Sequence, residues 1–354
     1  MLYQTENQHG GDVYGGGITL DFSANTNPLG TPPGVLEAVC RALPRLHRYP
    51  DPYCRRLVQA IAGHEQVPAS YILCGNGAAD LIYTYCAALR PRTAVELAPT
   101  FVEYGAGLAQ VGCRVERYFL HQAQNFDLDE RFLSFLEEKK PEVVFLCNPN
   151  NPTGRLIPLP LLEQILQYCA AQGARLFLDE CFLDLTEDGV SAKSLLAAHP
   201  ELLILKAFTK SYGMAGIRLG YCLCADNALL RRMAAASPPW NVSTPAQSAG
   251  VAALAERDFL QRTLSLVHTE RRWLTDNLTA LGFWVCPSHA NYLLFRGPLG
   301  LREGLLQQGI AIRGCGNYNG LGDGWYRIAV RPHGENEALI TAIRQFCKEK
   351  SLWQ

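Results

Sequence analysis

One lysine lies in a segment whose residue types could hold an amine over a bound cofactor. Lys210 falls within Lys206–Tyr221, directly after an apolar run that reads as a strand. A lysine in a loop is normally a solvated surface charge. Here Arg218 follows eight residues later, and glycines surround the lysine at positions Gly213, Gly216 and Gly220. This combination favours an amine held over a cofactor, with a guanidinium that binds the cofactor's phosphate.

A carboxylate ends a second apolar run. Asp179 closes the segment Arg175–Glu180, which reads as a buried strand. Burying a carboxylate is costly unless the group is paired. Two interpretations stay open: Asp179 caps the next helix, or it pairs with a protonated pyridine nitrogen and so keeps the ring an electron sink.

Two loops add groups that could contact the same ligand. Gly75-Asn76-Gly77 opens a helix after the apolar Tyr71–Cys74, and glycines there would let a phosphate approach the free N–H groups of that helix. Gly-Asn-Gly is also an ordinary turn. The loop Asn148–Gly154 follows the strand-like Val143–Cys147, and its two prolines fix the backbone and could direct an Asn amide into a site.

These groups follow strands in a chain whose apolar periodicity alternates between strand and helix. Repeated units of this kind predict a mainly parallel sheet with helices on both faces. Ligands in such sheets bind beyond the carboxyl ends of the strands. The predicted strands are Ala94–Ala98, Arg114–Leu120, Glu142–Cys147, Ala174–Leu178 and Leu202–Lys206, and the helices between them are Phe101–Val111, Leu128–Glu138 and Leu159–Ala171.

The rest of the chain predicts a smaller α+β domain and an N-terminal arm. The Pro238-Pro239 break precedes a helical stretch over Thr244–Leu281. Strands at Tyr292–Arg296 and Trp325–Val330 and a helix from Glu335 complete this part. We expect an arm over residues 1–30 that packs with the small domain, a large domain over 31–237 and a small C-terminal domain over 238–354.

Composition limits the classes of function. The 354 residues carry a formal net charge of −1, so neither nucleic acid nor a membrane surface is indicated as a partner. No apolar stretch approaches the ~20 residues of a membrane span, and no signal segment is evident. The thirteen cysteines include no C-x-x-C pair, which favours core thiols of a reducing compartment over disulfides or a metal site. A cytoplasmic protein is expected.

Together these residues resemble the fold-type-I pyridoxal-5′-phosphate (PLP) enzymes, which have the aspartate-aminotransferase fold, over essentially the whole chain. The resemblance implies that Lys210 binds PLP as a Schiff base and is the catalytic residue. It implies that Asp179 pairs with the pyridine nitrogen and that Asn151 hydrogen-bonds the 3′-oxygen. Phe101 matches the position that stacks on the ring, with Tyr104 as the second choice.

The same resemblance assigns the cofactor's phosphate to Arg218 and to Gly75, Asn76 and Gly77. Many relatives also have a serine where this chain has Ala207, and a hydroxyl or acidic residue directly after Gly77. Because both groups are missing here, phosphate binding would depend more on backbone N–H groups, Thr209 and Arg218. The segment Arg48–Pro52 is similar to one in which a tyrosine reaches the phosphate of the neighbouring subunit. If Tyr49 does so, the enzyme is a homodimer with shared active sites.

Two related families fit best, namely histidinol-phosphate aminotransferase and L-threonine-O-3-phosphate decarboxylase of cobalamin biosynthesis. Phe182 favours the decarboxylase, because the aminotransferases usually have there a tyrosine that touches the cofactor's 3′-oxygen. Four segments are also similar to the decarboxylase family: His9–Asp12, Leu20–Gly30, Pro238–Ser243 and Ile312–Leu321.

The expected reaction is decarboxylation of L-threonine O-3-phosphate to (R)-1-amino-2-propanol O-2-phosphate. Arg313 and Arg327 are the expected clamps for a substrate with two anionic groups. His9 and Asn25 are candidates for the substrate phosphate, and Arg331 is a possible third cation. The alternatives are a histidinol-phosphate aminotransferase, an L-serine O-phosphate decarboxylase and a non-catalytic PLP-binding regulator.

Overall fold

The structure, a computed structural model, describes residues 9–350 and is built around two sheets. The larger sheet has seven strands in the order β2-β8-β7-β6-β5-β3-β4. Strands β7, β6, β5, β3 and β4 run parallel, while β8 is antiparallel to both β7 and β2. The strands are β2 (Ile72–Gly75), β3 (Thr93–Ala98), β4 (Arg114–Phe119), β5 (Val143–Cys147), β6 (Arg175–Asp179), β7 (Leu202–Ala207) and β8 (Gly220–Cys224).

Helices cover both faces of this sheet because successive residues of its strands face opposite cores. In β5, Val143, Phe145 and Cys147 belong to one core, and Val144 and Leu146 belong to the other. The first core is covered by α3 (Ala78–Leu89), α4 (Glu103–Gln110) and α8 (Asn227–Ala236). The second is covered by α1 (Pro33–Ala42), α2 (Arg55–Glu65), α5 (Arg131–Lys139), α6 (Leu159–Gln172) and α9 (Thr244–Ala253).

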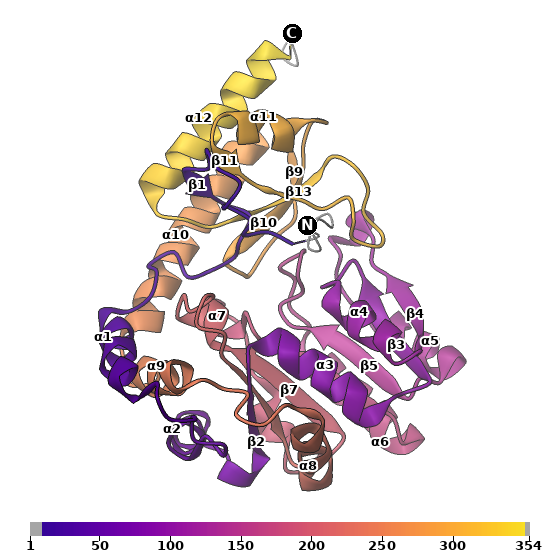
Figure 1. The fold of residues 1–354 in the computed structure, drawn as a ribbon. Coiled ribbons are helices and arrows are strands. Elements are labelled where there is room, and N and C mark those ends of the chain that lie inside the picture. The colour runs from indigo at the N-terminus through magenta and orange to yellow at the C-terminus, as the bar shows by residue number, and fades with distance from the viewer. Residues whose placement is uncertain (1–8, 351–354) are drawn as a thin grey trace.

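The smaller sheet is antiparallel, with the order β12-β13-β10-β9, and lies at the other end of the molecule (Figure 1). Its strands are β9 (Trp284–Val285), β10 (Tyr292–Arg296), β12 (Arg313–Gly314) and β13 (Trp325–Ala329). A third core joins it to α10 (Phe259–Ala280), α11 (Leu301–Gln307) and α12 (His333–Glu349). The N-terminal segment joins this part, since β1 (Leu20–Asp21) pairs with β11 (Ile310–Ala311).

Short helical turns complete the chain. The one-turn helix α7 (Phe208–Ser211) follows β7 directly. The 3₁₀ turns are η1 (Leu43–Arg45), η2 (Ala69–Tyr71), η3 (Gln122–Gln124), η4 (Leu183–Leu185) and η5 (Ala192–Leu195).

The predicted α/β fold with a mainly parallel sheet is confirmed, and one predicted element is wrong. The helix expected over Thr244–Leu281 is two helices, α9 and α10, separated by residues 254–258. The break is needed because α9 packs against α1 and α2, whereas α10 runs to the smaller sheet. The domain limits at residues 30 and 237 stay predictions. No helix of residues 9–350 is long and apolar enough to cross a membrane.

Candidate active site

A cavity of about 220 Å³ lies where β5, β6 and β7 end, and residues of the smaller sheet and the N-terminal segment also line it. The strands deliver their polar groups here because parallel strands end at one edge of a sheet. The predicted site residues that line it are His9, Asn25, Phe101, Tyr104, Asn151, Asp179, Thr209, Lys210, Arg218, Arg313 and Arg327.

Lys210 reaches this cavity from α7. Burial lowers the pKa of Lys210 to about 8, and the nearby charges of Arg327 and Arg218 act in the same direction. A larger share of the side chain is therefore the uncharged amine, which is the form that attacks a carbonyl. The Nζ atom lies 5.5 Å from the centre of the Phe182 ring.

Asp179 is buried at the end of β6 and has two neutral hydrogen-bond donors. The Tyr104 hydroxyl donates to Oδ2 at 2.7 Å, and the Cys181 N–H donates to Oδ1 at 2.8 Å. Burial raises the pKa of Asp179, although these hydrogen bonds and Lys210 oppose the rise. A buried carboxylate with only neutral donors is suited to pair with a protonated ring nitrogen, whose positive charge would stabilise the charge of Asp179.

Arg327 on β13 is buried, and the oxygens that accept its hydrogen bonds are neutral. Its Nη1 donates to Asn151 Oδ1, and its Nη2 donates to the Ser23 carbonyl at 2.9 Å. Its Nε has no hydrogen-bond partner among residues 9–350. A buried guanidinium that donates only to neutral oxygens is suited to bind an anionic ligand. Arg313 pairs with Arg327 across β12 and β13, so two cations line the same wall.

Asn25 gives the clearest sign that a polar ligand belongs in the cavity. Its side chain is only 1% exposed, and neither Oδ1 nor Nδ2 has a hydrogen-bond partner in the described part of the chain. Leaving both atoms unsatisfied costs free energy unless a ligand binds them. His9 lines the cavity nearby and contacts Glu103 Oε1 through Nε2 at 2.8 Å.

The expected phosphate site is formed in part. Ala78 and Ala79 at the start of α3, with Thr209 and Arg218, line the cavity, so an anion could meet the N-terminus of α3. Gly77 has a φ of +87°, a conformation that L side chains rarely adopt, and a Cβ there would lie 2.7 Å from Arg218 Nη2. Gly75, Asn76 and Gly77 do not line the cavity themselves, and the Asn76 N–H donates instead to Asp80 Oδ2 at 3.0 Å.

Two other predicted residues lie elsewhere. Tyr49 is 76% exposed and stacks on Trp240 with 4.4 Å between ring centres, outside the cavity of its own chain. Arg331 is bound to Glu335 and does not line the cavity. Sequence reasoning missed Ser23, whose backbone carbonyl holds Arg327, and Tyr318, which also lines the cavity. A backbone acceptor leaves no signal in residue type, whereas Tyr318 falls in the recognised segment Ile312–Leu321.

Known proteins resemble this chain over most of its length. The family model "Aminotransferase class I and II" matches residues 18–346. The threonine-phosphate decarboxylase of Salmonella typhimurium is 40% identical over 331 residues, which are 92% of this chain and 90% of that protein. The histidinol-phosphate aminotransferase of Geobacillus sp. is 33% identical over 350 residues, 96% and 93% of the two chains.

A solved structure shows the same fold with a cofactor. The histidinol-phosphate aminotransferase of Sinorhizobium meliloti, in complex with pyridoxal-5′-phosphate, has a TM-score of 0.83 at 24% identity and covers 93% of this chain and 92% of its own. The acidic, amide and cationic groups around Lys210 fit this cofactor. The chain therefore belongs to the PLP-dependent aminotransferase class I and II family, with the aspartate-aminotransferase fold.

Proposed function

We propose that the protein removes CO₂ from L-threonine O-3-phosphate and gives (R)-1-amino-2-propanol O-2-phosphate, a step of cobalamin biosynthesis. The observation that carries this choice is Phe182. Its ring is buried at the cavity, packs edge-on against Tyr292 and faces the Lys210 amine. Phenylalanine cannot donate the hydrogen bond to the cofactor's 3′-oxygen that a tyrosine usually donates at this position in histidinol-phosphate aminotransferases. The 40% identical decarboxylase supports the same reading.

The proposal gives each group in the cavity a role. Lys210 would hold PLP, Asp179 would face its ring nitrogen, and Asn151 would face its 3′-oxygen. Bound PLP supplies an electron sink for a bond at the substrate's Cα. Arg313 and Arg327, with Asn25, would hold the substrate's phosphate and carboxylate so that the Cα–carboxylate bond projects from the ring plane. Lys210 would then return a proton to Cα.

A shared dimeric site belongs to the same proposal. Several large apolar side chains are exposed between α1 and residue 53, and Trp240 stacks on one of them, Tyr49. The others are Leu36, Leu43, Leu46 and Tyr53. Exposed apolar side chains of this kind are frequent at protein interfaces. We propose that a second copy of the chain covers this surface and that Tyr49 reaches the phosphate of its partner's PLP.

Two other reactions would use nearly the same residues. Transamination of histidinol phosphate is favoured by relatives such as that of Geobacillus sp.. Decarboxylation of L-serine O-phosphate differs by one methyl group, which is worth about 1–3 kcal/mol in a pocket.

The test is a side-by-side assay with threonine phosphate, serine phosphate and histidinol phosphate, in the absence of any 2-oxoacid. We expect catalytic release of CO₂ from threonine phosphate, with a kcat/KM above that for serine phosphate. Conversion of the bound cofactor to its amine form by histidinol phosphate, with no CO₂ from threonine phosphate, would establish the aminotransferase instead.

A further inference from the structure

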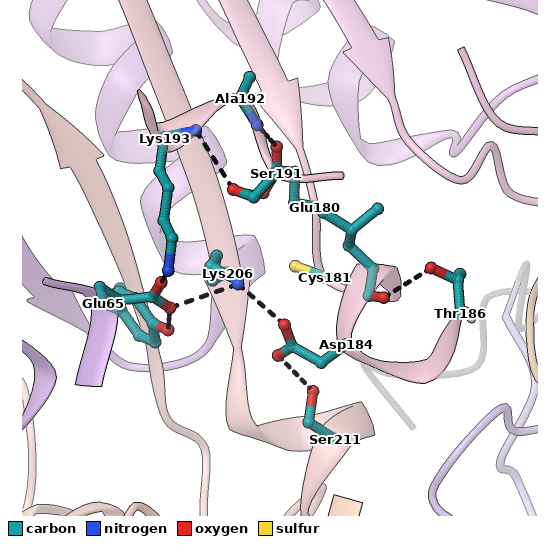
Figure 2. Close-up of polar contacts among 12 residues, drawn as sticks. Glu65, Glu180, Cys181, Asp184, Thr186, Ser191, Ala192, Lys193, Lys206 and Ser211 are labelled. Carbon is teal, nitrogen blue, oxygen red and sulfur yellow. Dashed lines mark hydrogen bonds and ion pairs between the residues drawn. The ribbon is translucent and has the colours of Figure 1, made fainter. Parts of the chain in front are cut away.

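A largely buried group of charges surrounds Lys206 on β7, the strand that directly precedes α7 and Lys210 (Figure 2). Lys206 on β7 is 4% exposed, and its Nζ lies 2.8 Å from Asp184 Oδ1 and 3.3 Å from Glu65 Oε1. Burial opposes the charge on Lys206, but Asp184 and Glu65 more than offset it and raise the pKa of Lys206. The ammonium is therefore charged and is shared between two carboxylates.

Such a cluster is costly to bury, and stability alone gives a weak reason for it. Apolar side chains of similar size are often as stable in place of a buried ion pair. The neighbours of Lys206 on the same face of β7, Leu202 and Ile204, are apolar core residues. An apolar residue at position 206 would continue that core. The charge of Lys206 therefore indicates a role other than packing in the core.

Asp184 connects the cluster to the segment that holds the reactive amine. Its second oxygen, Oδ2, accepts a hydrogen bond from Ser211 Oγ at 3.0 Å, and Ser211 directly follows Lys210. The Ser211 carbonyl in turn accepts from Asn27 Nδ2 at 2.7 Å. Ser211 is consequently held both through its side chain and through its backbone.

Asp184 also lies close in sequence to a residue on the other side of the amine. It lies in η4, two residues after Phe182, whose ring contacts the Lys210 amine. One carboxylate thus bonds β7 through Lys206 and α7 through Ser211, while its own turn carries Phe182. Asp184 thus joins three parts of the chain that lie around the Lys210 amine.

We propose that Asp184, held by Lys206, is a positioning residue that orients Lys210 toward the cofactor through its hydrogen bond with Ser211. The proposal rests on the role of Lys210 as the PLP lysine and not on the choice of substrate. Because covalent capture needs the amine at a defined angle to the carbonyl carbon, a loosened α7 slows capture without emptying the site.

The test compares Ser211→Ala with Ser191→Ala in the full-length protein. Both changes remove a hydroxyl that donates to a carboxylate, but Ser191 Oγ donates to Glu180 Oε2 at 2.6 Å and not to Asp184. Apoprotein is mixed with PLP, and the rate of covalent capture is followed by visible absorbance. For Ser211→Ala we expect capture and kcat to fall about tenfold, a typical loss for a hydrogen bond to a charged group, with KM little changed. Ser191→Ala should leave both rates at the wild-type value.

A double-mutant cycle decides whether the effect passes through this one bond. Asp184→Asn should slow capture as Ser211→Ala does, and the combined variant should be no slower than Asp184→Asn alone. If Ser211→Ala captured PLP at the wild-type rate, the proposal would be overturned. It would also be overturned if the effects of the two changes on the capture rate were fully additive in the combined variant. Capture of PLP does not depend on the substrate, so this test can fail while the decarboxylase holds, and the reverse is also true.

Discussion

Arg327 Nη1 donates a hydrogen bond to Asn151 Oδ1, and this contact links β13 of the smaller sheet to the loop after β5 of the larger one. Because Oδ1 is occupied, the amide Nδ2 of Asn151 is the group left to donate to a ligand. This orientation suits a donor to the 3′-oxygen of PLP. The guanidinium that would hold a substrate anion therefore also sets the orientation of a residue at the cofactor.

Replacing Arg327 with Met should impair substrate use while cofactor binding persists. Hydrogen bonds to a charged group contribute about 1.5–3 kcal/mol each, so kcat/KM for threonine phosphate should fall tenfold or more. The visible absorbance of bound PLP should remain. Arg331→Met is the matched control, because Arg331 pairs with Glu335 outside the cavity. Equal losses in the two variants would remove Arg327 from the substrate site.

Lys210 should be the residue that borohydride fixes to PLP. Lys193 and Lys206 both form ion pairs with Glu65, so neither amine is expected to react with PLP. Peptide mapping after reduction should place the label on Lys210, and Lys210→Ala should show no turnover. Label recovered on Lys193 or Lys206 would contradict the assignment.

The pH dependence of PLP capture should report the lowered pKa of Lys210. The uncharged amine is the reactive form, so the capture rate of the apoprotein should rise with pH through about 8, well below the ordinary 10.5. Arg327→Met should move this midpoint upward, because the Arg327 charge helps to lower the pKa. The measurement is the capture rate across pH 6 to 10, with Arg331→Met again as control. A midpoint unchanged by loss of Arg327 would show that its charge does not act on Lys210.

A shared site should make PLP affinity sensitive to one exposed hydroxyl. Tyr49→Phe keeps a ring to stack on Trp240 but loses the group proposed to reach the partner's cofactor. The Kd for PLP should rise about tenfold or more, and sedimentation should show an unchanged dimer. Tyr53→Phe, a second exposed tyrosine nearby, should bind PLP normally. A monomeric wild-type protein would exclude the shared site.

Much of the fold could be predicted because the inner strands of the larger sheet are buried on both faces and appear as short apolar runs. The bounds of β10 agree with the prediction, and those of β3, β5 and β7 differ from it by one residue. The break between α9 and α10 could not be seen, since each helix has its own apolar pattern and only tertiary packing sets their directions. The reversal of β8 likewise depends on its neighbours in the sheet.

The candidate site was predictable where chemistry follows a strand end, as for Asp179, Asn151 and Lys210. Other parts had no such signal. The partner of Arg327 at Ser23 is a backbone carbonyl, and the proposed contact of Tyr49 would lie on another subunit. Lys206 did leave a trace, a lysine within the apolar run Leu202–Ala207, but its partners Glu65 and Asp184 are distant in sequence. Only the folded chain brings them together.

The charged group formed by Glu65, Lys193, Lys206 and Asp184 should also make the stability of the protein depend on pH. Burial would raise the pKa of Glu65, but Lys206, Lys193 and the Tyr221 hydroxyl together lower it to about 2. A carboxyl with a lowered folded pKa stabilises the protein above its ordinary pKa of 4.5, and this contribution is lost as pH falls from 4.5 toward 2. At about 1.4 kcal/mol for each pH unit, the contribution is about 3 kcal/mol.

Glu65→Gln cannot gain or lose this charge, so its free energy of unfolding should fall less steeply below pH 4.5 than that of wild type. At pH 7 the variant should be the less stable protein, because Lys206 and Lys193 then lose an anionic partner. The gap between the two should narrow with acid as wild-type Glu65 becomes protonated. Denaturant unfolding of PLP-saturated protein, at one fixed protein concentration from pH 7 to 3.5, measures this gap. If the free energies of unfolding of the two proteins changed in parallel over that range, the pKa of Glu65 would be the same in the folded and unfolded chain. Lys206 would then not stabilise the charged form of Glu65.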